Sequence, residues 1–159
     1  MALHKLLVDD FCDTPFSLLA IHCGLEDYRL AYLLNKYLEL NLSRMSRDLD
    51  YKYFAASYSV FEWYNHENEI TWNLISNVCR KEEDGLQSSG SLFTSQNRVL
   101  KTYHLLPEHK NVDYLVKITN EAQYLNEKIV LGKIQSIPQI VTSYTIDIEN
   151  LKSKDNLIF

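Results

Sequence analysis

Two small groups of side chains in this sequence have types and spacings that suit chemistry. The first is the pair of carboxylates at Glu108 and Asp113, which are separated by a short polar segment. Paired carboxylates bind cations, or they split their pKa values so that one acts as an acid and the other as a base. The same two residues also suit a turn between strands, where polar side chains bond to nearby backbone. We expect the turn role, because turn and cross-strand contacts are the usual function of such residues.

The second group is the adjacent pair His22 and Cys23, which directly precedes a predicted helix. A helix N-terminus favours an anion, so a sulfur that faced it would be activated as a thiolate. A nucleophile also needs a positioned base. Neighbouring residues on a strand point to opposite faces, so the base need not be His22, and the fold would have to bring in His66 or His104. We favour the alternative of a buried, inert cysteine, since free cysteine is so often buried.

The sequence lacks the motifs of the commonest metal and cofactor sites. Its five histidines show no H-E-x-x-H or zinc-finger spacing. It contains no G-x-x-x-x-G-K-[ST], G-x-G-x-x-G or G-x-S-x-G, and its four glycines leave little material for a phosphate-binding loop. We therefore predict no metal and no cofactor, and we assign no catalytic residue.

The composition is that of an ordinary folded domain, with 46% hydrophobic and 23% charged residues among 159. The net charge of −5 disfavours nucleic-acid binding, because it provides no basic footprint for phosphates. No apolar run approaches the roughly 20 residues of a membrane-spanning helix, and Asp9 and Asp10 interrupt any signal-peptide core. Three cysteines without C-x-x-C spacing suit reduced thiols. We predict a cytoplasmic protein that does not enter a membrane.

Hydrophobic periodicity predicts the elements that must position these residues. Helices are predicted over residues 25–40 and 121–134, the second capped by Asn120, and strands over 16–22, 53–60, 70–78, 99–106, 112–118 and 140–148. Residues 65–68 are typical of a hairpin loop, and residues 81–97 of a mobile connection. The strands at 99–106 and 112–118 are predicted to form a second hairpin.

This order of elements predicts a single α+β domain over residues 1–159. We expect a largely antiparallel sheet of about five to six strands, with the two main helices packed on one face. The strand-helix unit at the start and the helix-strand unit at the end would place the two terminal strands side by side at the centre of the sheet.

Aromatic side chains are numerous on the first predicted hairpin, among them Tyr58, Phe61, Trp63 and Trp72. They occupy both strand faces, and Tyr and Trp are enriched in the cores of interfaces. A protein partner or a second copy of the chain would then cover the outer face. The alternative is that helices and the long connection already cover both faces, in which case the aromatics are ordinary cross-strand pairs.

The segment from Leu106 to Tyr114, Leu-Pro-Glu-His-Lys-Asn-Val-Asp-Tyr, resembles the signature of the IPExxxVDY family, which occurs mainly in Bacteroidota. The matching positions are Leu106, Pro107, Glu108, Val112, Asp113 and Tyr114, with leucine where the family name has isoleucine. The stretch Ile21–Leu34 and the last residues of the chain are similar to other recurring blocks of that family. The resemblance implies no activity, cofactor or catalytic residue.

Two functional hypotheses of different classes follow. The preferred one is a non-enzymatic binding or adaptor module that self-associates or binds a protein partner, through the aromatic hairpin and the turn at 107–114. The alternative is a small enzyme that uses Cys23 with a distant histidine, or Glu108 with Asp113. A deep pocket joining either pair would favour the enzyme, and a flat apolar face would favour the module. An RNA-associated accessory role comes third, because the chain is acidic.

Overall fold

The computed structural model describes residues 15–51, 56–84, 98–120 and 125–159. Its helices are α1 (Asp27–Leu38) and α2 (Glu127–Gln135), with 3-10 turns η2 (Pro107–His109) and η3 (Lys154–Leu157). Its strands are β1 (Phe16–His22), β2 (Ser43–Arg44), β3 (Leu49–Tyr51), β4 (Ala56–Tyr58), β5 (Val60–Asn65), β6 (Ile70–Ser76), β7 (Val78–Asp84), β8 (Arg98–His104), β9 (Tyr114–Asn120) and β10 (Thr142–Ile146). The predicted α+β class is confirmed.

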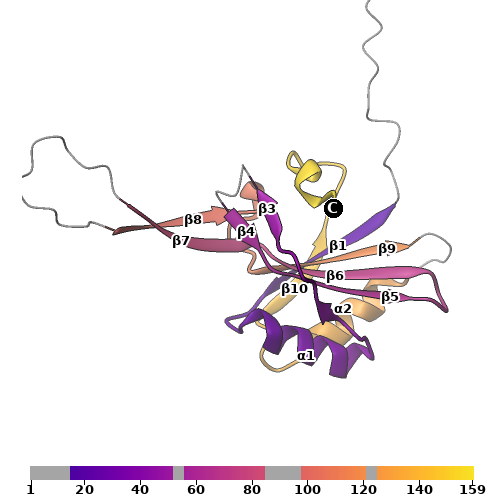
Figure 1. Cartoon of the computed structure of the whole chain (residues 1–159). Helices are drawn as coiled ribbons and strands as arrows, with labels where there is room; N and C mark the ends of the chain where they lie inside the picture. The colour runs from indigo at the N-terminus through magenta and orange to yellow at the C-terminus, as the bar shows by residue number, and fades with distance from the viewer. Residues whose placement is uncertain (1–14, 52–55, 85–97, 121–124) are drawn as a thin grey trace, which may run out of the picture.

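Six strands form one antiparallel sheet in the order β10-β1-β9-β6-β5-β2. Both helices lie on the same face of this sheet, as predicted (Figure 1). Leu30 and Leu34 of α1 and Ile134 of α2 pack there against alternate residues of the strands, such as Leu19 and Val116.

The opposite face of the sheet is also covered. Leu18 and Ala20 of β1 point to that face, where Tyr58 of β4 and Leu157 of the C-terminal segment (residues 147–159) pack over them. Figure 1 shows β3, β4 and the C-terminal turn on the side away from the helices. Because β1 is buried on both faces, its sequence is a continuous apolar run rather than an alternating one.

The predicted pairing of the second hairpin is wrong. Strand β8 pairs with β7, while β9 lies between β1 and β6 in the main sheet. Residues 81–84, predicted as part of a connection, belong to β7, and residues 85–97 lie outside the described residues. The error arose because Arg80 to Asp84 are all charged and carry no apolar face by which a strand is recognised.

The terminal strands and the second helix also differ in detail from the prediction. Strands β1 and β10 are neighbours as predicted, but β10 is an edge strand, because β9 takes the other side of β1. Helix α2 is capped by Asn126, whose Oδ1 accepts hydrogen bonds from the N–H groups of Lys128 and Ile129. Asn120, the predicted cap, ends β9 instead.

The motif segment and the candidate binding surface

The motif segment, Leu106 to Tyr114, is organised by Asn77, a fully buried residue between β6 and β7. The Asn77 Nδ2 donates to the carbonyls of His109 and Val112, both at 2.9 Å. Its Oδ1 accepts from the Leu106 N–H at 2.8 Å. One side chain thus satisfies three backbone groups of the turn, which carries the chain from β8 into the main sheet.

Glu108 binds the C-terminal segment. Its carboxylate accepts hydrogen bonds from the backbone N–H of Ser153, at 2.8 Å, and from the Ser153 hydroxyl. The Asn156 side chain adds a 2.7 Å bond to the carbonyl of Leu105, beside the motif segment. Burial acts to raise the pKa of the Glu108 carboxyl, but the hydrogen bonds from Ser153, together with those from the backbone of Glu108 itself and of Lys152, outweigh it and hold that pKa below its usual value.

Asp113 and Tyr114 hold a different segment, the connection between β1 and α1. The Asp113 Oδ2 accepts from the Cys23 N–H at 3.0 Å, and the Tyr114 hydroxyl donates to the Leu25 carbonyl at 2.6 Å. Burial raises the pKa of Tyr114, so its phenol stays a neutral donor. The two carboxylates of the motif segment therefore bond to separate stretches of backbone, which favours the structural role over an acid/base or metal pair.

Glu108→Gln is expected to lower the free energy of unfolding at pH 7 by only about 0.5 kcal/mol, because solvent screens this exposed carboxylate. The folded-state pKa is lowered, so the contribution of the carboxylate is present above its unfolded value of about 4.3 and is lost as the pH falls through the folded value. Urea unfolding should therefore show a larger difference between the two proteins at pH 7 than at pH 3. The exposed Glu149→Gln is the control, and an equal loss at both pH values would contradict the assignment.

Cys23 is placed as a buried core residue rather than as a nucleophile. It packs in the core beneath the helices, and burial raises the pKa of its thiol, as does the nearby Asp113 carboxylate. His22 contacts Tyr144 of β10 instead, with 3.2 Å between its Nε2 and the tyrosine hydroxyl oxygen. Within the described residues, no hydrogen bond joins Cys23 to a histidine. These observations favour the inert cysteine.

The aromatic residues proposed as an interface lie mostly inside the fold. Tyr58, Phe61 and Trp72 are buried, and Trp63, which faces Trp72 across β5 and β6, is half-buried against the same core. Tyr64, at 42% exposure, is the neighbour that does face solvent. The abundance of aromatics is thus explained by two core layers, one on each face of the sheet, and an interaction surface has to be sought elsewhere.

An exposed pair of strands, the ribbon formed by β7 and β8, projects away from the main sheet (Figure 1). The five residues 98–102 of β8 are all exposed, including two apolar ones, Val99 at 48% and Leu100 at 61%. A two-stranded ribbon without a core is marginally stable by itself in water. Its exposed side chains are therefore available to a partner, and a partner would also stabilise it.

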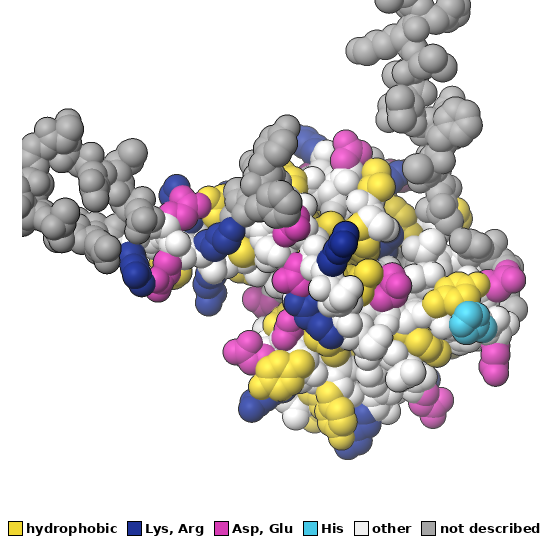
Figure 2. Space-filling view, in the orientation of Figure 1, with side chains coloured by type: hydrophobic (Ala, Val, Ile, Leu, Met, Phe, Trp, Pro, Cys, Tyr) yellow, Lys and Arg dark blue, Asp and Glu magenta, His cyan; other side chains and the backbone are white. Residues whose placement is uncertain are grey.

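Charged side chains of both signs line this ribbon, as Figure 2 shows. Glu82 pairs with Arg98 at 3.4 Å, and Glu83 pairs with Lys101 and accepts a 2.6 Å hydrogen bond from the Tyr103 hydroxyl. Solvent screens these exposed ion pairs, so each contributes little to stability. Cys79 and Tyr103 at the inner end of the ribbon pack against the core on the sheet face away from the helices, but the described residues of its outer part have no core.

A shallow cavity of about 240 Å³ lies elsewhere, beside the start of β1, and is lined in part by Phe16, Leu125 and Glu127. The Glu127 carboxylate there accepts hydrogen bonds from the hydroxyls of Ser17 and Thr145. Cys23, Glu108 and Asp113 are not among its lining residues.

In the part of the chain that the structure describes, no group of three or more His, Cys, Asp or Glu side chains could hold a metal ion. Nor does any described helix have the length and apolar character needed to span a membrane.

The candidate surface has to be interpreted from its own residues. No protein-family model, curated protein or solved structure matches the chain. The sequence analysis missed two features of this protein, the role of Asn77 in organising the motif segment and the exposure of the ribbon. The only signal for the ribbon was the charged run from Arg80 to Asp84.

Proposed function

We propose that this protein is a non-enzymatic, cytoplasmic binding module that presents the β7–β8 ribbon to a protein partner. The observation that supports the proposal best is the run of five exposed residues on β8, with Val99 and Leu100 among them. On the motif segment alone, we also propose that the chain is related to the IPExxxVDY family.

The ribbon suits a protein partner for two reasons. Its apolar side chains offer contact area that the described part of the protein leaves exposed, and its strands offer backbone hydrogen bonds to an added strand. Val99 and Leu100 are neighbours on β8, so they point to opposite faces of the ribbon. A partner that grips the ribbon would bury both.

The two pairs that carried the enzyme hypothesis have structural partners instead. Cys23 is buried with a raised thiol pKa, and Glu108 and Asp113 bond to separate backbone segments. A catalytic group would need an accessible position next to a substrate. The binding module is therefore the better supported of the two hypotheses.

The test is a native-lysate pull-down with mass spectrometry that compares the wild type with a Val99→Thr/Leu100→Thr variant. Threonine keeps the strand propensity and removes most of the apolar contact. The matched control is Tyr28→Ser/Tyr32→Ser, which removes two equally exposed side chains, at 58% and 66%, from α1. We expect a reproducible partner to be lost with the ribbon variant and retained with the control. Equal capture by both folded variants would overturn the proposal.

A further inference from the structure

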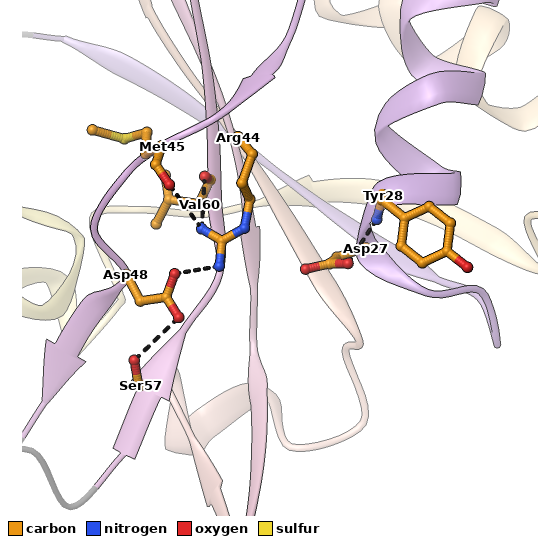
Figure 3. Close-up of polar contacts among 7 residues, drawn as sticks. All are labelled: Asp27, Tyr28, Arg44, Met45, Asp48, Ser57 and Val60. Carbon is orange, nitrogen blue, oxygen red and sulfur yellow. Dashed lines mark hydrogen bonds and ion pairs between the residues drawn. The ribbon is translucent and has the colours of Figure 1, made fainter.

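The two edges of the six-stranded sheet are protected very differently. Strand β2 forms one edge, and it is only two residues long. The Arg44 guanidinium occupies it, donating to the carbonyls of Met45, at 3.3 Å, and Val60, at 3.4 Å, and pairing with Asp48. Asp48 accepts a further bond from Ser57, so the charged group is fixed in place (Figure 3). Short, charged edges of this kind resist pairing with another strand.

The opposite edge, β10, has neither form of protection. It is five residues long, and its sequence, Thr-Ser-Tyr-Thr-Ile, carries no charge. Tyr144 on this strand is 39% exposed. Val141, the residue directly before the strand, is 82% exposed. An uncharged and exposed edge strand is a template for another strand.

The hydrogen bonds of β1 show which backbone groups of β10 face outward. The Ile21 carbonyl accepts from the Asp113 N–H, on the β9 side, so Ile21 turns its backbone groups away from β10. Ser143, its partner in register, must then turn its own N–H and C=O to the open edge, as must Thr145 two residues on. The Gln135 side chain agrees with an outward-facing Ser143 carbonyl. Its Nε2 donates to that carbonyl at 2.9 Å, so the carbonyl is not directed at β1.

We propose that β10 pairs with β10 of a second copy of this chain, antiparallel about a two-fold axis at Tyr144, which joins the two sheets. In this register, Ser143 of each copy lies opposite Thr145 of the other, and both are residues with outward-facing backbone. Two such pairs form four interchain hydrogen bonds. Every outward N–H and C=O of Ser143 and Thr145 is then used.

One neighbouring register fails on the same criterion. An axis at Ser143 would set Thr145 opposite Val141, whose N–H is already donated to the His22 carbonyl at 2.8 Å. The axis at Tyr144 instead brings two tyrosine rings together as a cross-strand aromatic pair, and it sets no like charges opposite each other. The bond from Gln135 is compatible with it, since a carbonyl oxygen has two lone pairs.

The first test is the mass in solution, measured by light scattering. The wild type should have twice the 18.6 kDa mass of the single chain. Thr145→Pro removes an outward N–H that the isolated chain does not use, so the variant should fold and should dimerise at least tenfold more weakly. Tyr144→Lys should act similarly by placing two like charges on the axis. A wild type that is monomeric at 100 μM would overturn the dimer.

The second test fixes the register. Strand residues that face each other without hydrogen bonds have Cα atoms about 4.5 Å apart, within disulfide range. In a Cys12→Ser/Cys79→Ser background, Tyr144→Cys should form an interchain disulfide on oxidation. Thr142→Cys is the control, since its two copies would lie about 14 Å apart. Equal crosslinking of both variants would refute the register.

The dimer and the ribbon can be tested independently. The β10 edge shares no residue with the ribbon, so Val99→Thr/Leu100→Thr should leave the measured mass unchanged. If the wild type is monomeric and the ribbon variant still loses its partner, the proposed dimer is refuted and the proposed function stands. If the wild type is a dimer and no partner depends on the ribbon, only the proposed function is refuted.

Discussion

Replacing Asn77 with alanine should lower the free energy of unfolding by about 4 kcal/mol, since it removes three hydrogen bonds to the backbone of the motif segment. The Leu106 N–H and the Val112 carbonyl lose the side chain that bonds them, while the His109 carbonyl keeps its bond from the Val112 N–H. Asn77 is fully buried, so water cannot readily replace the lost bonds. Urea unfolding followed by circular dichroism measures the change.

Asn73→Ala is the matched control for this measurement. Asn73 is also buried, at 3% exposure, but among the described residues its side chain makes a single hydrogen bond, from Nδ2 to the Glu62 carboxylate at 2.9 Å. We expect a loss of about 1 kcal/mol there. If the two variants were equally destabilised, the loss would reflect removal of any buried amide, and Asn77 would not be what organises the turn.

Local pattern was sufficient to predict the main elements. The apolar run at Phe16–His22 is a strand buried on both faces, and the helical spacing of Leu30, Leu34 and Leu38 is the buried stripe of α1. Both signals arise from residues that are close together in the sequence. Strand β10 was found in the same way, although its position at the edge of the sheet was not.

The contacts of the motif segment could not be predicted, because they join residues far apart in the chain. Glu108 meets Ser153, 45 residues later, and Asp113 meets Cys23, 90 residues earlier. A polar residue in a turn has many conceivable partners, and the sequence does not rank them. The sequence favours a structural role for Glu108 and Asp113, because polar turn residues usually bond to nearby backbone. The partner of each residue could be identified only in the folded structure.

The ribbon was predicted only in part, for a related reason. The strand at residues 99–106 was predicted, but the end of β7 and its pairing with β8 were not. A strand is recognised when one of its faces is apolar, and residues 80–84 of β7 are all charged. The same rule favours the second interpretation of the aromatic hairpin, in which its side chains are covered on both faces. Its two apolar faces are the sign of a sheet that is covered on both sides.

Trp72→Ala should therefore lower the stability of the fold rather than remove a binding surface. Trp72 is 6% exposed and lies in the core beneath the helices, opposite Trp63. Truncation of a buried aromatic residue typically costs about 3–5 kcal/mol, because a large cavity remains. We expect a loss of about 4 kcal/mol in urea unfolding, and a lower thermal midpoint to match.

Tyr64→Ala, on the same strand as Trp63, separates the two interpretations of these aromatics. Tyr64 is 42% exposed and makes an edge-to-face contact with His66, so its removal should cost no more than about 0.5 kcal/mol. If the hairpin were an interface, Trp72→Ala would leave the stability of the isolated protein intact and would remove a partner. If it is core, as its burial indicates, Trp72→Ala destabilises the fold, while Tyr64→Ala alters neither stability nor the capture of a partner by the ribbon.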